Sequence, residues 1–310
     1  MVIPLGKQNH FWILRTTDCG VRQMSAVTEP FSAIASRDAL RQERIEILAY
    51  ALAVLGTTTA ICACFRLFHV TNNWAANALM FVPSAIAAAF MFVGHQPLGS
   101  PFRQVGWGLG KPIYWLCGIL FPVLVLGTSL SLSVWMGYAA AAPASAPVSR
   151  VAGHPTKLLL NMLLYLAISL PLAFGEEFGW RGYAQGKLTR SFGLAKGLLL
   201  LGLLWGFWHT PIYCVMGVYP SHPILGPFVM TPIDNILAVV PMAWFYLKSR
   251  NIWLPTFVHA FADILWGFSD LLYPKSHEIH SWLLLEVAQL IVSIVLLMNL
   301  RADRGRDATL

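Results

Sequence analysis

Charged residues are scarce in this 310-residue sequence. Asp, Glu, Lys and Arg make up 11% of it, whereas soluble globular domains contain about 25%. Hydrophobic residues account for 57% of the chain. This composition argues against a soluble enzyme with one large core and is typical of a polytopic membrane protein.

Cysteine is also sparse, with an odd total of five. Four of the five lie in apolar runs, and we interpret them as small core residues. Cys62 and Cys64 are two positions apart, so on a helix they point to nearly opposite sides. Neither a disulfide scaffold nor a cysteine metal site is indicated.

Apolar runs long enough to cross a bilayer, about 20 residues each, recur through the sequence. They predict an all-α, polytopic membrane helix bundle with about eight transmembrane helices. The chain has no convincing internal repeat, so an inverted-repeat transporter is not favoured. The predicted spans are 46–66, 74–94, 113–137, 157–179, 194–217, 224–247, 252–273 and 281–300.

The distribution of Lys and Arg predicts the orientation of the bundle. Most of the 21 basic residues fall in the N-terminal tail, in alternate loops and after the last span. The positive-inside rule therefore places the N- and C-termini in the cytoplasm. This topology, with contact to anionic lipid, also accounts for the net charge of +7, so no nucleic-acid partner is expected.

The expected organisation has three parts. Residues 1–44 form a flexible cytoplasmic tail, although Ser36 to Glu46 could make a short helix leading into the first span. The transmembrane bundle covers 45–300, and 301–310 is a cytoplasmic tail. We expect a multi-pass integral membrane protein, and the lack of disulfides fits a bacterial inner (plasma) membrane.

Two adjacent carboxylates, Glu176 and Glu177, follow the apolar run 158–172, with Arg181 shortly after. A charge near the bilayer centre costs about 3 kcal/mol. On a helix, Glu177 and Arg181 are four apart and can pair, whereas Glu176 is turned about 100° away. We therefore predict a structural Glu177–Arg181 pair, which leaves Glu176 for another task. The alternative is an ion cluster at the membrane interface.

Two later apolar segments carry histidines. His209 ends the aromatic run that starts at Trp205, and a lone histidine there is often only a core residue. His259 and Asp263 are four apart and share a helix face, so the acid could fix the imidazole tautomer or form a structural pair. Glu176 can reach His209 only if the fourth span runs deeper than drawn, for example if its helix continues through Arg181.

Three further acids lie on the outer portions of the predicted spans six, seven and eight: Asp234, Asp270 and Glu286. We interpret them as interfacial or helix-end residues. A proton path in a transporter is the alternative reading of the same residues.

Together, the glutamate, histidine and aspartate side chains could activate water and hold a tetrahedral oxyanion. Their order resembles the three motifs of the CAAX-protease and bacteriocin-processing (CPBP) membrane endopeptidases, relatives of the type II CAAX prenyl endopeptidase. The matching motifs are Glu176-Glu177-x-x-x-Arg181, Trp205-x-x-x-His209 and His259-x-x-x-Asp263.

The resemblance implies roles for these residues and a catalytic core over 157–275. Glu176 matches the catalytic glutamate, and His209 matches the histidine that acts with it on water. His259 and Asp263 match the pair that stabilises the oxyanion. The family often has Asn at the last position, so Asp263 would have to be protonated, orient His259 or bind a cation.

The resemblance leaves the cofactor open. Glu176, His209, His259 and Asp263 form a chemically reasonable zinc set, but the His-Glu-x-x-His signature is absent. A reaction without metal is therefore preferred, with a divalent metal such as Zn²⁺ as the alternative. No other cofactor is expected.

The function implied is an intramembrane endopeptidase that uses a Glu/His-activated water. Its expected partners are the lipid bilayer and a peptide or membrane-protein substrate. One alternative is a non-proteolytic binding or bacteriocin self-immunity protein on the same fold. A third is a proton-coupled transporter that depends on Asp234 or Asp270.

Overall fold

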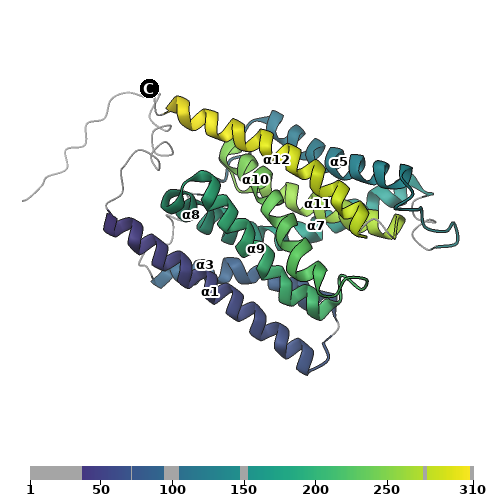
Figure 1. Ribbon diagram of the computed structural model, residues 1–310, viewed down its shortest axis with the longest axis horizontal. Coiled ribbons are helices and arrows are strands. Elements are labelled where there is room, and N and C mark those ends of the chain that lie inside the picture. The colour runs from purple at the N-terminus through teal and green to yellow at the C-terminus, as the bar shows by residue number, and fades with distance from the viewer. Residues whose placement is uncertain (1–36, 71, 94–104, 147–152, 275–277, 308–310) are drawn as a thin grey trace, which may run out of the picture. The chain divides into compact units, whose positions relative to one another are not determined.

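In the computed structural model, the described residues are 37–70, 72–93, 105–146, 153–274 and 278–307 (Figure 1). Most of the predicted N-terminal tail therefore lies outside the described residues. All regular secondary structure in the described ranges is helical. The elements are α1 (Arg37–Leu67), α2 (Asn73–Ala78), η1 (Leu79–Phe81), α3 (Val82–Val93), α5 (Pro112–Trp135), α7 (Pro155–Glu177), η2 (Phe178–Ala184), α8 (Gln185–Phe192), α9 (Leu194–Met216), η3 (Gly226–Met230), α10 (Thr231–Ser249), α11 (Trp253–Leu272) and α12 (Ile279–Asp307).

Seven helical stretches of the described chain are long and apolar enough to cross a membrane. They coincide with seven of the eight predicted spans, and the predicted all-α membrane bundle is confirmed. The eighth prediction, 252–273, coincides with α11, which is a helix but is not among the seven. Its sequence includes the polar residues His259, Asp263 and Asp270.

The order of helices across the bundle places α9 and α10 in the middle. α1 packs on α9, α9 packs on α10, and α10 packs on α12, so α1 and α12 lie on opposite sides of this pair (Figure 1). α11 packs against α7, α5 and α10. The three helices that carry the predicted motifs, α7, α9 and α11, therefore belong to one bundle, and α7 is buried only at its C-terminal end, where Glu176 and Glu177 lie.

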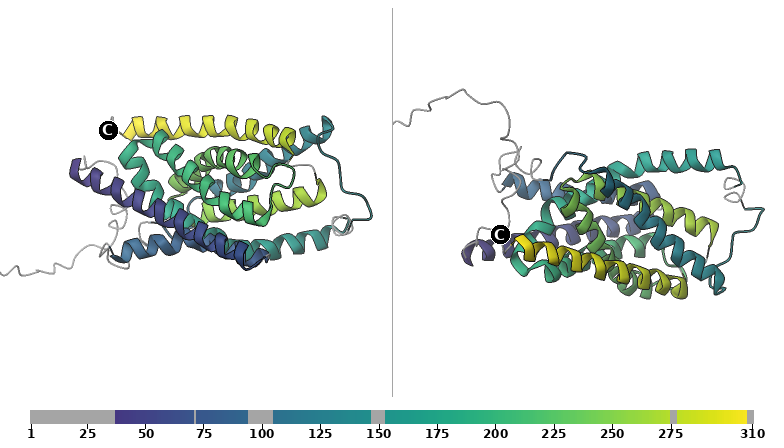
Figure 2. Two further views of the ribbon diagram at one scale, coloured as in Figure 1. Left: turned by 60° about the horizontal axis from the view of Figure 1, so that its bottom comes forward. Right: turned by 90° about the horizontal axis from the view of Figure 1, so that it is seen from above.

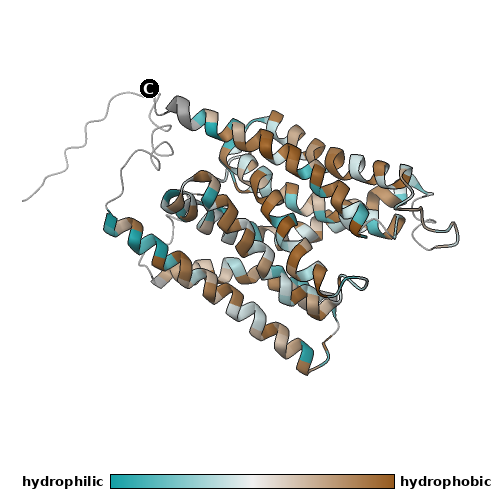
Figure 3. Cartoon of the chain, in the orientation of Figure 1, coloured by the Kyte–Doolittle hydropathy of each residue, from teal (hydrophilic) through white to brown (hydrophobic). Residues whose placement is uncertain are grey.

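The start of α1 and the end of α12 lie at the same end of the bundle (Figure 2). Hydrophilic residues gather at the start of α1 and near α8, while brown, apolar ribbon dominates elsewhere (Figure 3). Two carboxylates of α1 form ion pairs with basic residues of α8. Glu43 lies 2.7 Å from Arg190, and Glu46 lies 2.9 Å from Lys187. The predicted helical segment before the first span thus forms the first turns of α1, held against α8 by ion pairs.

Close helix contacts fix one face of α7. An added Cβ at Gly175 would lie 2.7 Å from the Phe81 ring, and one at Gly179 would lie 2.5 Å from Pro83. Small residues four apart allow helix backbones to approach closely in membranes. Because this face meets η1 and α3, the adjacent Glu176 and Glu177 point to other helices.

A second close contact joins α9 to α10. An added Cβ at Gly202 would lie 2.7 Å from Ile236 Cα, and one at Gly206 would lie 2.5 Å from Pro232 Cα. These glycines are again four apart and flank Trp205 along the chain. The contact therefore fixes the position of Trp205.

The prediction that the cysteines are small core residues is correct for Cys62, which is buried, and wrong for Cys64 and Cys214, which are exposed. Lipid-facing positions are as apolar as core positions, so an apolar run does not distinguish the two environments. Cys19 lies outside the described residues.

Candidate active site

The fourth predicted span extends further than its hydropathy indicates. α7 continues through the π-helical segment η2 into α8, so residues 155–192 form one helical stretch. π-Helical turns occur frequently at functional sites, and this one begins directly after Glu177. Because the helix continues through Arg181, Glu176 lies inside the bundle, where it can contact residues of α9.

The predicted pair between Glu177 and Arg181 is present and fully buried. Arg181 Nη1 lies 3.0 Å from Glu177 Oε1, and both side chains are 0% exposed. The same oxygen lies 2.8 Å from His259 Nδ1 of α11. Glu177 therefore does more than neutralise Arg181, because it also connects α7 to the histidine of the third motif.

Glu176 is also buried, and it forms no ion pair with Arg181, which pairs with Glu177 as the helical spacing predicts. Glu176 Oε2 accepts hydrogen bonds from the indole N–H of Trp180, at 3.1 Å, and of Trp205, at 2.7 Å. Neither of these bonds uses Oε1. Hydrogen bonds to a carboxylate favour its charged form and fix its orientation, so the interfacial ion cluster considered from sequence does not describe this residue.

Trp205 connects the parts of the site. Its indole N–H holds Glu176, and its backbone carbonyl lies 3.0 Å from His209 Nδ1. The Arg181 guanidinium covers its ring at 4.4 Å from the ring centre, and the His259 ring lies 5.4 Å away. Motif one on α7, motif two on α9 and motif three on α11 thus meet around one tryptophan.

His209 is half-buried, and its Nδ1 faces the carbonyl of Trp205. A carbonyl oxygen only accepts hydrogen bonds, so this nitrogen carries the proton in the neutral ring. The other nitrogen, Nε2, is then an acceptor. The ring also packs against Trp208 and Tyr213.

His259 and Asp263 share a helix face, as predicted. His259 Nε2 lies 3.5 Å from Asp263 Oδ2, while Nδ1 is held by Glu177. His259 is buried, whereas the Asp263 side chain is 44% exposed. Of the three roles considered for Asp263, this contact favours orientation of His259.

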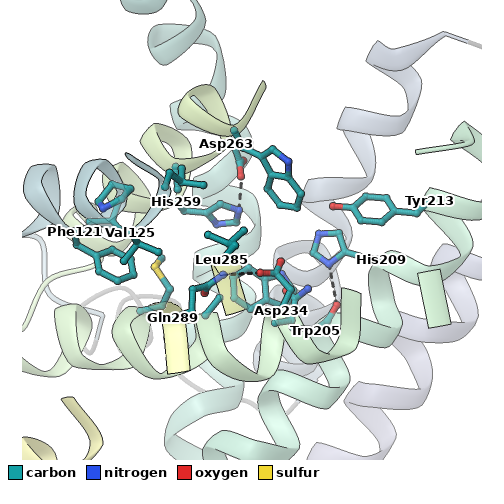
Figure 4. A pocket seen from close by; sticks show the side chains of 18 residues that line it. Phe121, Val125, Trp205, His209, Tyr213, Asp234, His259, Asp263, Leu285 and Gln289 are labelled. Carbon is teal, nitrogen blue, oxygen red and sulfur yellow. Dashed lines mark hydrogen bonds and ion pairs between the residues drawn. The ribbon is translucent and has the colours of Figure 1, made fainter. Parts of the chain in front are cut away.

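A cavity of about 120 Å³, partly open to its surroundings, lies between α5, α9, α10, α11 and α12. His209, His259 and Asp263 line it, and the Tyr213 hydroxyl points toward it (Figure 4). Glu176 is not part of the cavity wall, but Trp205, which binds its carboxylate, is.

Asp234 lies in the first turn of α10, as the helix-end prediction expects, and Asp270 is exposed, whereas the prediction is wrong for Glu286, which is buried within α12. Asp234 lines the cavity and accepts a 2.8 Å hydrogen bond from Gln289 of α12. Glu286 is 6% exposed. In the sequence, Asp234 and Glu286 are visible only as single acids inside apolar runs. Their surroundings could not be predicted, because these depend on how α10 packs on α12.

No group of three or more His, Cys, Asp or Glu side chains is arranged to hold a metal ion in the part of the chain that the structure describes. Glu176 Oε2 already accepts from two indoles, and His209 Nδ1 faces a carbonyl. The four residues considered as zinc ligands are not gathered into such a group.

Comparison with known proteins shows similarity to a family model, over the motif-bearing helices, and to one archaeal protein. Residues 158–265 match the family model described as Type II CAAX prenyl endopeptidase Rce1-like. A stretch of 90 residues is 34% identical to the protein named CAAX prenyl protease 2 from Methanococcus maripaludis.

The second match covers 28% of this chain and 33% of the archaeal protein, so the chain spans about a third of that relative's length. The first matched segment, 158–265, includes every predicted site residue from Glu176 to Asp263. By this segment the chain is similar to the Rce1-like type II CAAX prenyl endopeptidases.

Proposed function

We propose that this protein is an intramembrane endopeptidase that hydrolyses a peptide bond of a membrane-associated or cytosol-presented peptide. One observation carries the proposal. The adjacent carboxylates of α7 bind two different helices, Glu176 through Trp205 of α9 and Glu177 through His259 of α11. A fixed carboxylate and two imidazoles are thereby assembled beside a cavity, which are the groups that water activation requires.

The proposed reaction starts with a water between Glu176 and His209. Glu176 is anchored through Oε2, so Oε1 takes the proton, while His209 Nε2 accepts the second hydrogen bond of the water. The hydroxide forms a bond to the carbonyl carbon and gives a tetrahedral oxyanion. Collapse breaks the C–N bond, and the proton on Glu176 passes to the leaving amine.

His259 is proposed to stabilise the oxyanion. Its Nδ1–H is held by Glu177 at 2.8 Å, whereas Nε2 lies 3.5 Å from Asp263, longer than an ordinary hydrogen bond, so the Nε2–H of the doubly protonated ring is the donor left for the oxyanion. The Nε2 side lies next to the cavity. In this scheme Asp263 is a positioning residue, and the donor to the oxyanion is the imidazole.

The test is Glu176→Gln, which keeps the shape of the side chain and removes the base. Hydrolysis of a quenched-fluorescence peptide library by the purified protein in nanodiscs should fall by about 10²- to 10⁴-fold, the usual contribution of general acid–base catalysis. His209→Ala should fall by a similar factor. Glu278→Gln, the same change at a side chain that is 40% exposed, serves as the matched control. Full activity of Glu176→Gln rules out the proposed base.

Metal content of the purified protein completes this experiment. A stoichiometric metal whose removal by a chelator abolishes hydrolysis, and whose return restores it, would replace the metal-free scheme with a metal-assisted one. Two other outcomes point to the alternative functions. A self-immunity phenotype that survives Glu176→Ala indicates a binding protein, and a transport activity that needs Asp234 but not Glu176 indicates a proton-coupled transporter.

A further inference from the structure

Tyr213 of α9 is a polar residue of the cavity wall that the proposed reaction does not use. Its ring packs against His209, with 5.1 Å between the ring centres, and against Tyr219 at 5.9 Å. Its hydroxyl points toward the cavity (Figure 4). Among the residues that the structure describes, none forms a hydrogen bond with this hydroxyl. The ring is therefore held by its neighbours, while the polar end is available to a molecule in the cavity.

The hydroxyls of the buried tyrosines are arranged differently. Tyr50, Tyr183 and Tyr219 are buried, and each of their hydroxyls is hydrogen-bonded to a residue of another element. This is the usual arrangement, because a tyrosine in a protein interior normally finds a partner for its O–H. Tyr213 departs from it, and Tyr213 is the one of these four that lines the cavity.

Tyr213 lies one helical turn beyond the groups proposed to activate water. Trp205, His209 and Tyr213 are spaced by four residues, so they line the cavity from one face of α9. Trp205 binds Glu176, and His209 is the proposed partner of the water. At 1.5 Å per residue, Tyr213 is about 6 Å further along the helix than His209. It therefore lies beside the reacting groups and not among them.

The cavity is more open on the Tyr213 side. Trp205 is 5% exposed, whereas Tyr213, two turns later, is half-buried. On the α11 wall, the His259 side chain is 8% exposed and that of Asp263, one turn later, is 44% exposed. The cavity of about 120 Å³ is smaller than the pockets of about 300–1,000 Å³ that enclose drug-sized ligands. A bound peptide therefore has to continue out of it, past the more open side.

A peptide in this position needs partners for its backbone. Every residue of an extended segment carries a carbonyl acceptor, and in the apolar interior of a membrane protein an unpaired carbonyl is costly. Most of the cavity wall is apolar and offers no donor, as with Val125, Leu126, Ala238 and Met242. A phenol hydroxyl can donate one hydrogen bond to such a carbonyl.

We infer that the Tyr213 hydroxyl donates a hydrogen bond to a backbone carbonyl of the bound peptide. An extended peptide advances about 3.4 Å per residue, so a separation of about 6 Å places this carbonyl about two residues from the scissile bond. The inference rests on the proposed function, since the scissile bond is located by Glu176 and His209. It names the substrate as a peptide bound with an extended backbone, and Tyr213 as a residue that binds it outside the chemical step.

The first experiment is Tyr213→Phe, which keeps the ring and removes the hydroxyl. With the best-cleaved peptide of the library, KM should rise by about 3- to 10-fold and kcat should change little, as for the loss of one neutral hydrogen bond formed equally in both states. The midpoint of thermal unfolding should not fall, because no hydrogen bond within the described chain is lost. An unchanged KM, or a fall in kcat alone, overturns the inference.

Tyr165→Phe is the matched control. Tyr165 lies on α7, is 50% exposed and does not line the cavity. The same chemical change is made there without altering the cavity, so both kinetic constants should stay as in the unaltered protein.

The second experiment changes the peptide. Each backbone amide near the scissile bond is replaced in turn by an ester, whose carbonyl is a weaker acceptor. In the unaltered protein, one replacement about two residues from the scissile bond should raise KM, and this effect should disappear in Tyr213→Phe, as in a double-mutant cycle. An equal ester effect in both proteins overturns the inference. If the variant does not fold, the ester series alone decides, and the absence of any sensitive position on either side of the scissile bond overturns it.

A binding measurement separates this inference from the proposed function. Fluorescence anisotropy of labelled library peptides is recorded with Glu176→Gln and with the double variant Glu176→Gln, Tyr213→Phe. Weaker binding by the double variant, with no hydrolysis by the unaltered protein, upholds the Tyr213 contact and overturns the endopeptidase. Hydrolysis by the unaltered protein, with equal binding by the two variants, upholds the endopeptidase and overturns the Tyr213 contact.

Discussion

The Trp205 indole lies between the two carboxylates of the first motif. Its N–H donates to Glu176, and its ring is covered by the guanidinium that pairs with Glu177. The residue was expected only as the aromatic start of the second motif. These contacts explain why a tryptophan suits this position, because its ring supplies a flat apolar surface and its N–H supplies one hydrogen-bond donor.

Substitution Trp205→Phe should separate these two roles. Phenylalanine keeps an aromatic ring but loses the 2.7 Å hydrogen bond to Glu176. Hydrogen bonds to charged groups contribute about 1.5–3 kcal/mol, so kcat should fall by about 10- to 100-fold with little change in KM. Steady-state kinetics on one peptide measures both constants.

Trp135→Phe is the control for this substitution, because Trp135 is 81% exposed at the end of α5. It should leave both constants unchanged. An increase in KM alone for Trp205→Phe would mean that the indole contacts substrate instead of positioning Glu176.

At the scale of helices, the site depends on two close contacts made by pairs of glycines. Gly175 and Gly179 bring α7 and η2 close to η1 and α3, and Gly202 and Gly206 bring α9 close to α10. The first contact directs the two glutamates away from α3. The second sets the distance between Trp205 on α9 and Asp234 on α10, which lie on the same cavity.

Gly206→Ala should therefore weaken the bundle and the site together. The new Cβ would lie 2.5 Å from Pro232 Cα, which is backbone and cannot rotate away. Overpacking of this kind costs about 1–3 kcal/mol. The midpoint of thermal unfolding in detergent should fall, and hydrolysis should fall with it.

The matched control is Gly56→Ala in the middle of α1, where an added Cβ meets nothing within 4 Å. Its unfolding midpoint should stay the same or rise, because Ala favours a helix more than Gly does. An unchanged midpoint for Gly206→Ala would show that α9 and α10 can separate without loss of stability.

At the scale of the whole molecule, the arrangement of the helices shows which segments lie at each end of the bundle. It does not show which end faces the cytoplasm. The start of α1 and the end of α12 lie at one end (Figure 2), as an even number of crossings requires. The basic residues Lys187 and Arg190 of α8 lie beside the start of α1. The positive-inside rule assigns this end to the cytoplasm.

Single-cysteine labelling in intact cells, on a background that lacks the native cysteines, tests this assignment. A cysteine at Arg190 should be protected from a membrane-impermeant maleimide, and one at Ala142, in the segment after α5, should react. Labelling becomes equal after the membrane is permeabilised. The reverse pattern would mean that the predicted orientation is wrong.

Sequence reasoning was most accurate where partners lie within one helical turn. The pairs Glu177–Arg181 and His259–Asp263 follow from a spacing of four residues, and both are present. The all-helical bundle follows from the length of the apolar runs. Helix periodicity fixes both kinds of feature without knowledge of the rest of the chain.

The second partner of each glutamate could not be predicted. Glu177 reaches His259 across 82 positions of sequence, and Glu176 reaches Trp205 across 29. Such contacts depend on which helix faces meet. Every face of a membrane helix is apolar, so hydropathy does not mark the buried one.

The sequence by itself determined the helices, the order of the motifs and the acids and histidines available for chemistry, because these depend on local spacing and composition. Only the tertiary structure decided which of them meet. It joined Glu176 to Trp205 and Glu177 to His259, placed Asp234 in the wall of the cavity, and buried Glu286 inside the bundle. The physical reason is the close approach of backbones at glycine pairs, which sets the distances between helices and so the geometry of the site.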